Sequence, residues 1–85
     1  MRTYKIFILR RAQKEMEKIP RRDQLRIREA IRSLAIDPFQ GKQLHAEYEG
    51  KWAVRVWPYR IMYIIEKNIV TVTVLRIAHR KDVYR

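Results

Sequence analysis

Two arginines and a histidine near the end of the chain have side chains suited to phosphate chemistry. Arg55, Arg60 and His79 are predicted to share one face of a small sheet, because side chains alternate across each strand. A guanidinium group is planar, permanently charged and able to bind a phosphate through two hydrogen bonds. Imidazole takes up and releases a proton near neutral pH. Together these residues suit a site that binds a phosphate and transfers a proton beside it.

Each of the three residues also has an ordinary structural explanation. Arg55 alternates with apolar neighbours and would suit any exposed strand position. His79 is expected at a strand end, where a histidine is often a solvated or capping residue. Arg60 could cap a hairpin, but an arginine on an otherwise apolar face is unusual, so it is the strongest candidate.

Three strands would position these residues as an antiparallel meander. They span 52–57, 60–66 and 69–78, are rich in β-branched and aromatic residues, and are separated by turns at 58–59 and 67–68. Two-residue loops make one face wholly apolar, and it must therefore meet a core: Trp52, Val54, Val56, Ile61, Tyr63, Ile65, Val70, Val72 and Val74. The opposite face carries Ala53, Arg55, Trp57, Arg60, Met62, Ile64, Thr71, Thr73, Leu75, Ile77 and His79. Because proline cannot take a positive φ, a longer first loop is an alternative.

The preceding residues predict the layer that covers the apolar face. Residues 3–9 resemble a strand that adds to the meander, and the helical period then begins. One helix ends at Pro20, and a second runs until Asp37-Pro38. Residues 39–49 are irregular, with Phe39, Leu44 and Tyr48 as anchors into the core. The predicted class is α+β: an N-terminal strand, a helical hairpin and a three-stranded antiparallel meander, with the helices on one face.

Composition limits the chain to one basic domain, residues 1–85. Twenty Lys and Arg against nine Asp and Glu give a net charge of +11, which favours polyanionic partners, above all nucleic acid. The absence of cysteine excludes a disulfide framework and a Cys-based metal site. The apolar run 6–9 is too short for a signal sequence or a membrane span, so a cytoplasmic protein with no membrane partner is expected.

Several short motifs together resemble a known family. The stretches K-W-x-V-R-V, Y-R-I-x-Y and I-x-H-R-K-D-V-Y, after a helix that ends in Asp-Pro, are similar to the RelE/ParE superfamily of type II toxin–antitoxin toxins. The last stretch looks RelE-like. The resemblance implies a small endoribonuclease that cuts messenger RNA in the ribosomal A site without a metal or other cofactor. It also implies a cognate RelB-like antitoxin that forms a hetero-oligomer with the toxin.

The resemblance also implies roles for individual residues. Arg60 matches the family's phosphate-stabilising arginine, and Arg80 matches the arginine after the last strand. Tyr84 matches the tyrosine near the C-terminus, which would donate a proton or stack on a base. Arg55 matches a basic residue of the first meander strand and would assist. His79 is the candidate for proton transfer.

Other basic and aromatic residues are expected to bind RNA without taking part in the chemistry. Some relatives have a second lysine where this chain has Ala53, and Lys51 lies two positions away. Lys51, Arg76 and Lys81 would bind phosphates. Trp57 would either stack on a nucleotide or shield the edge of the sheet.

Two other functions are compatible with the same sequence. A ParE-type toxin has this fold but poisons DNA gyrase and has no nuclease activity. A plain RNA-binding module would need only the basic charge.

Overall fold

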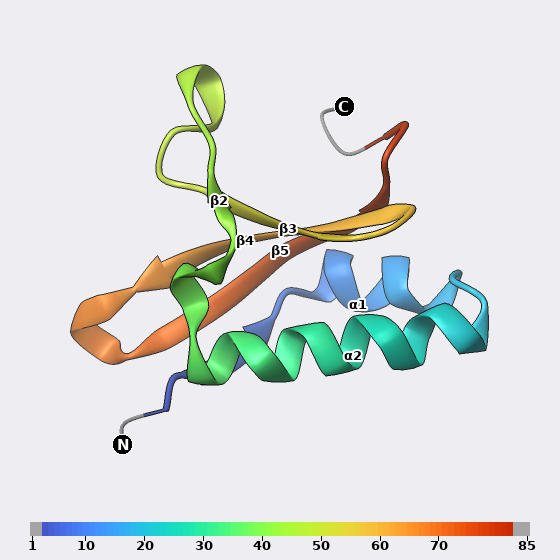
Figure 1. Cartoon of the computed structure of the whole chain (residues 1–85), viewed down its shortest axis with the longest axis horizontal. Coiled ribbons are helices and arrows are strands. Elements are labelled where there is room, and N and C mark those ends of the chain that lie inside the picture. The colour runs from blue at the N-terminus through green and yellow to red at the C-terminus, as the bar shows by residue number, and fades with distance from the viewer. Residues whose placement is uncertain (1–2, 83–85) are drawn as a thin grey trace.

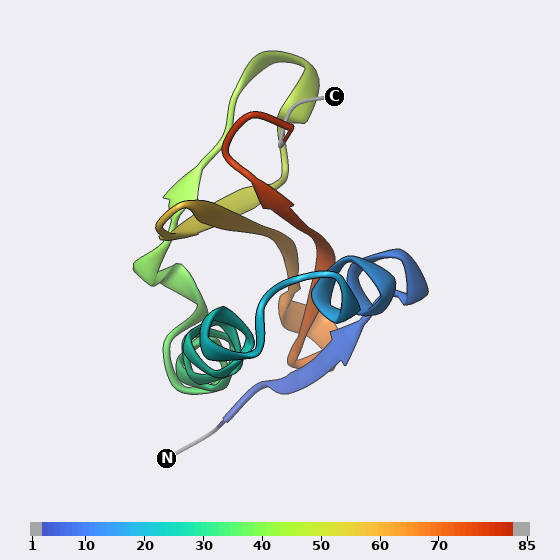
Figure 2. The same ribbon diagram turned by 90° about the vertical axis from the view of Figure 1, so that its right-hand side faces the viewer.

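The computed structural model describes residues 3–82, which form one sheet with two helices on one of its faces (Figures 1 and 2). The elements follow in the order β1 (Lys5–Ile8), α1 (Arg10–Glu17), α2 (Arg21–Ile36), β2 (Lys42–Gln43), β3 (Trp52–Val56), β4 (Tyr59–Glu66) and β5 (Thr71–His79). The strand order is β1-β5-β4-β3-β2, with β1 parallel to β5 and the other pairs antiparallel. The predicted α+β architecture is confirmed, and β2 is a fifth strand that the sequence did not predict.

The core lies between the helices and the sheet. α1 packs its apolar stripe against β5, and α2 packs against β1 and β3. The fully buried side chains of this core include Ala12, Ile27, Leu34, Ile61, Tyr63, Val72 and Val74. The Tyr63 hydroxyl donates a 2.7 Å hydrogen bond to the carbonyl oxygen of Pro38. Burial raises the pKa of Tyr63 to about 12. None of the helices within residues 3–82 has the length and apolar character needed to cross a membrane.

The first hairpin turns one residue earlier than predicted. Its two loop residues are Trp57 and Pro58, joined by a cis peptide bond, so that Val56 lies opposite Tyr59. A turn with a cis proline at its second central position needs no positive φ there. The pairing shifts by two residues, which keeps every side chain of β3 and β4 on its predicted face.

The second hairpin contains an irregularity that the prediction lacked. Its loop is four residues long, 67–70, which preserves the predicted faces as far as Tyr63 opposite Val74. The next pair is Met62 with Arg76, so one extra residue on β5 interrupts the alternation. Beyond this bulge the faces exchange. Ile77, predicted on the open face, is 1% exposed in the helix-side core, and the predicted face of His79 is also wrong.

A loop covers part of the sheet face that lies away from the helices. The segment between β2 and β3 rises from this side, as do residues 80–82 after β5 (Figure 1). Leu44 and Tyr48 pack there against Met62 and Ala78, forming a small second cluster. The expectation that Leu44 and Tyr48 anchor into the main core is therefore wrong, because both pack on the second face. The loop divides the second face into two hollows.

Candidate active site

Arg55 and Arg60 lie directly opposite each other on β3 and β4, on the face away from the helices. Both line one of the two hollows, which has a volume of about 420 Å³ and lies between β3, β4 and residues 40–45. No carboxylate among the described residues lines it. Like charges directly opposed on a sheet destabilise it, so an anion bound between them would relieve the repulsion. The predicted juxtaposition of these two arginines is therefore present in the structure.

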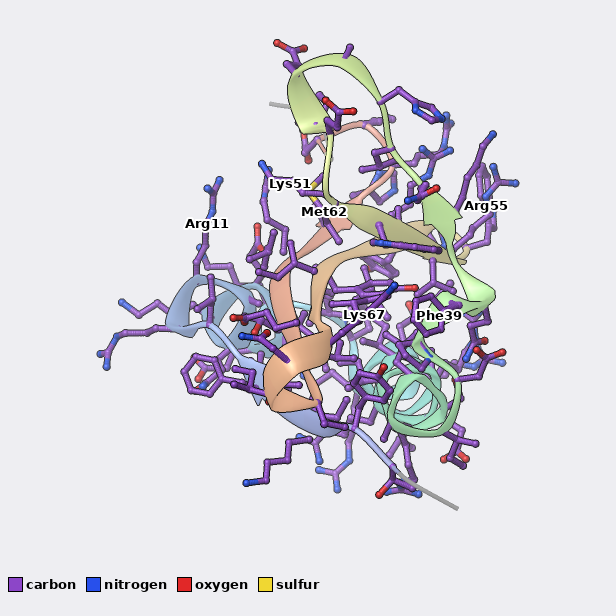
Figure 3. All side chains as sticks on the ribbon, turned by 90° about the vertical axis from the view of Figure 1, so that its left-hand side faces the viewer. Arg11, Phe39, Lys51, Arg55, Met62 and Lys67 are labelled. Carbon is purple, nitrogen blue, oxygen red and sulfur yellow. The ribbon has the colours of Figure 1, made fainter. Side chains whose placement is uncertain are left out.

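The side chain of Arg55 is exposed, and Figure 3 shows it projecting from β3 away from the body of the domain. Within residues 3–82, no ion pair joins Arg55 to a carboxylate. Arg60 is half-buried beside it and also lines the hollow. A partly desolvated guanidinium binds a phosphate more strongly than a fully exposed one, because the local dielectric is lower.

Two further side chains line this hollow that the sequence reasoning did not assign to the site. Lys42 pairs with Ala53 across β2 and β3, so both residues face the same side. His45 follows in the loop and also lines the hollow. Lys42 thus lies beside Ala53, the position at which some relatives have a second lysine. A two-residue strand has no detectable period, so only the pairing register could have revealed Lys42.

Gly41 allows β2 to approach the sheet closely. A Cβ atom at this position would lie 2.7 Å from the carbonyl oxygen of Ala53, and would also collide with the Tyr63 hydroxyl. Only glycine avoids this contact without a shift of the backbone. The close approach holds the neighbouring Lys42 against β3, and so holds one wall of the hollow.

Arg80 lies beside the turn of the first hairpin. Its backbone N–H donates a 2.8 Å hydrogen bond to the carbonyl oxygen of Pro58, and its guanidinium lies 5.1 Å from the centre of the Trp57 ring. This is a cation–π contact, which orients the guanidinium. Ala78 pairs with Arg60, and Arg80 follows two residues later towards the hairpin tip. Trp57 remains 55% exposed, which leaves area for another ring to stack.

His79 does not join the two opposed arginines. Because of the bulge it pairs with Tyr59 on the helix side, where the two rings meet edge to face with centroids 5.7 Å apart. Its Nδ1 accepts a 3.3 Å hydrogen bond from the backbone N–H of Lys81. Lys81 itself is exposed. Tyr84, the other residue predicted to transfer a proton, lies outside the described residues.

Lys51 and Arg76 lie on the other side of the loop, in a separate hollow of about 300 Å³. Figure 3 shows Lys51 beside Met62 and apart from Arg55. The Arg76 guanidinium donates hydrogen bonds of 2.7 and 3.2 Å to a Glu15 carboxylate oxygen, and this ion pair is largely buried. The structure therefore gives Arg76 a role in packing α1 against β5.

Sequence comparison places this arrangement in a known family. A family model described as "ParE toxin of type II toxin-antitoxin system, parDE" matches residues 6–84. The chain belongs to the RelE/ParE superfamily of type II toxins. The curated Toxin RelG of Mycobacterium tuberculosis is 36% identical over 76 residues, which is 87% of each chain. The resemblance seen in the short sequence motifs is thus confirmed at the level of the family.

Solved structures agree with this assignment. The toxin is similar to a chain of the toxin–antitoxin complex RelBE2 from Mycobacterium tuberculosis, with 30% identity, a TM-score of 0.86, and coverage of 92% of this chain and 99% of that one. A chain of the intact Escherichia coli RelBE complex gives a TM-score of 0.76 at 18% identity, covering 89% and 95% of the two chains. At that identity the second match shows the fold alone. Among residues 3–82, the toxin has no cluster of three His, Asp or Glu side chains that could hold a metal ion.

Proposed function

We propose that this toxin is a ribosome-dependent endoribonuclease that cleaves messenger RNA in the A site and so inhibits translation in the cytoplasm. The observation that carries the proposal is the direct opposition of Arg55 and Arg60 in a hollow that Lys42 and His45 also line. The cationic side chains of Lys42, Arg55 and Arg60 surround one small volume, which suits a phosphate far better than a neutral ligand.

The proposed reaction needs no metal ion or other cofactor. The 2′-hydroxyl oxygen of one nucleotide forms a bond to the adjacent phosphorus, and the bond from phosphorus to the 5′-oxygen breaks. The 2′-hydroxyl gives its proton to a base, and the departing 5′-oxygen receives one from an acid, which leaves a 2′,3′-cyclic phosphate and a free 5′-hydroxyl. Negative charge grows on the non-bridging oxygens during this exchange. Arg55 and Arg60 would bind that charge through fixed hydrogen-bond donors, the arrangement that lowers such barriers most.

Residues around the hollow would hold the message. Arg80 would bind the scissile or a neighbouring phosphate, and the exposed ring of Trp57 would stack on an unpaired base. Tyr84, by the family resemblance, would donate a proton or stack on a base. Lys51 and Lys81 would bind phosphates farther along the strand.

We further propose that a cognate RelB-like antitoxin binds this toxin in a hetero-oligomer. The support is the 30% identical relative, which was solved as a toxin–antitoxin complex. A chain of net charge +11 would bind an acidic or amphipathic segment that folds on contact.

One observation favours a second candidate function, the poisoning of DNA gyrase. The matching family model is the ParE toxin, and ParE-type members act without nuclease activity. This alternative gives the opposed arginines no role in chemistry, so mutation of the hollow separates the two.

The test is cleavage of a defined message during in vitro translation, with the message ends mapped. We expect cuts at A-site codons by the wild-type toxin, and a loss of about 10²- to 10³-fold in rate for Arg60→Ala, the usual effect of removing one donor that stabilises a transition-state charge. Arg32→Ala removes the same charge from the exposed side of α2 and is the matched control. An intact message, together with inhibited gyrase supercoiling, would favour the second candidate.

A further inference from the structure

We propose that His45 is the general base of the hollow and accepts the proton of the attacking 2′-hydroxyl group. This inference rests on the proposed nuclease function and names the residue that performs its proton transfer. The sequence contains two histidines, and only His45 lines the hollow that Arg55 and Arg60 share. His79 lies on the helix side of the sheet against Tyr59.

The side chains that line the hollow leave few alternatives for this step. An arginine does not deprotonate in a protein, and amide and aliphatic side chains do not titrate. No Asp, Glu or Tyr lines the hollow within the described residues. Within residues 3–82, the remaining lining side chain that could accept a proton is that of Lys42. Imidazole changes its charge between pH 5 and 8, and so is the better matched to a reaction near neutral pH.

The loop fixes His45 at the rim of the hollow. On one side of it, Leu44 packs in the second cluster and donates a 2.9 Å backbone hydrogen bond to Lys51. On the other side, Tyr48 packs in the same cluster, and its N–H bonds to the His45 carbonyl oxygen at 3.2 Å. The backbone is therefore tied down at both ends, while the imidazole remains exposed to an incoming strand.

The residue after His45 adopts an unfavourable backbone conformation. Ala46 has φ 59°, in the left-handed region that costs an L-residue roughly 1–2 kcal/mol. Such conformations persist where the surrounding structure enforces them, and they concentrate at functional sites. Here it occurs at the first residue of the short turn Ala46–Tyr48, directly after His45.

The rate of cleavage should depend on pH through this imidazole. Its neutral form accepts a proton, so we expect the single-turnover rate on programmed ribosomes to rise with pH and then level off. His45→Gln should lower the plateau by about 10²- to 10⁴-fold, the usual contribution of a general base, and should abolish the rising limb. His45→Ala should regain activity when free imidazole is added, because the site is exposed. Recovery by imidazole would not be expected of a residue that only shapes the loop.

Two parallel variants identify the titrating group. His79→Gln and Lys42→Met should both keep the rising limb, whatever they do to the plateau, and circular dichroism confirms that each variant is folded. The inference is overturned if His45→Gln retains the limb, if imidazole fails to restore His45→Ala, or if the limb disappears in either parallel variant. A wild-type toxin that does not cleave at all would instead contradict the proposed function.

Discussion

Removing the carboxylate of Glu15, which does not line the hollow of Arg55 and Arg60, should destabilise the fold substantially. Glu15 lies in α1, and one of its carboxylate oxygens accepts hydrogen bonds from Nη2 and Nε of Arg76. The other oxygen accepts a 2.9 Å hydrogen bond from the backbone N–H of Ile77. The β1–β5 pairing ends at Ile8 opposite Val74. Beyond that pair β5 would have an unprotected edge, and Glu15 satisfies the N–H exposed there.

The magnitude follows from the burial of this pair. The side chains of Arg76 and Glu15 are 15% and 22% exposed, so the ion pair is only partly screened by water. A hydrogen bond to a charged group contributes about 1.5–3 kcal/mol, and breaking a fully buried ion pair costs about 3–5 kcal/mol. For this partly accessible site we expect Glu15→Ala to lower the free energy of unfolding by about 2–3 kcal/mol. For a domain of this size, that corresponds to a fall in Tm of roughly 10–20 °C.

Urea unfolding followed by tryptophan fluorescence measures the effect. A double-mutant cycle with Arg76→Ala should give a coupling energy of about 1–3 kcal/mol between the two side chains. Glu29→Ala, which breaks an exposed ion pair with Arg32, is the matched control and should change stability by less than about 0.5 kcal/mol. The reasoning is refuted if Glu15→Ala loses no more than this control. It also fails if Arg76→Ala weakens RNA cleavage without any loss of stability.

Two further predictions concern the residues that join β2 and β4. The pKa of Tyr63 rises from 10.0 to about 12 on folding, so the folded state favours the neutral tyrosine. This contribution to the free energy of unfolding is fully present below pH 10. It is lost as the pH rises towards 12, which lowers stability by up to about 2–3 kcal/mol. Tyr63→Phe should lose that part of the alkaline dependence in urea unfolding at pH 9–12, and an unchanged slope would contradict it. Gly41→Ala should lower stability by about 1–3 kcal/mol and message cleavage by at least tenfold, because its Cβ would force β2 away from Ala53. If Gly41→Ala has the unfolding free energy and the cleavage rate of the wild type, the close approach of β2 to Ala53 is excluded.

Most of the fold could be predicted because its strands carry a strong apolar period. The alternation from Trp52 to Val74 identified the core face correctly except at Val70, which lies in the second hairpin loop, and it placed Arg55 and Arg60 together. The loop of the first hairpin lies one residue earlier than predicted. The pairing of β3 and β4 therefore shifts by two residues, which leaves each side chain on its predicted face. The order of the helices followed from their apolar stripes and from the prolines at their ends.

The errors have two causes. The bulge on β5 opposite Met62 and Tyr63 leaves no mark in the alternation of a strand that is apolar on both faces, so the face of His79 could not be predicted. The placement of Lys42 and His45 depends on a two-residue strand and an irregular loop, held by contacts between distant residues. Local sequence patterns do not encode such contacts, so neither side chain was predicted to belong to the site.

The distribution of the acidic residues explains how a chain of net charge +11 keeps one face positive while it folds. Several acidic side chains have partners at the helices and strand ends. Glu15, Asp23 and Glu29 form ion pairs with Arg76, Arg26 and Arg32 respectively. Asp37 accepts a hydrogen bond from the backbone N–H of Phe39, and Glu66 accepts one from the hydroxyl of Thr73. None of these five lines the hollow of Arg55 and Arg60. The interactions that these five carboxylates make therefore lie outside the lining of the hollow. An RNA phosphate bound in the hollow would add negative charge beside Lys42, Arg55 and Arg60.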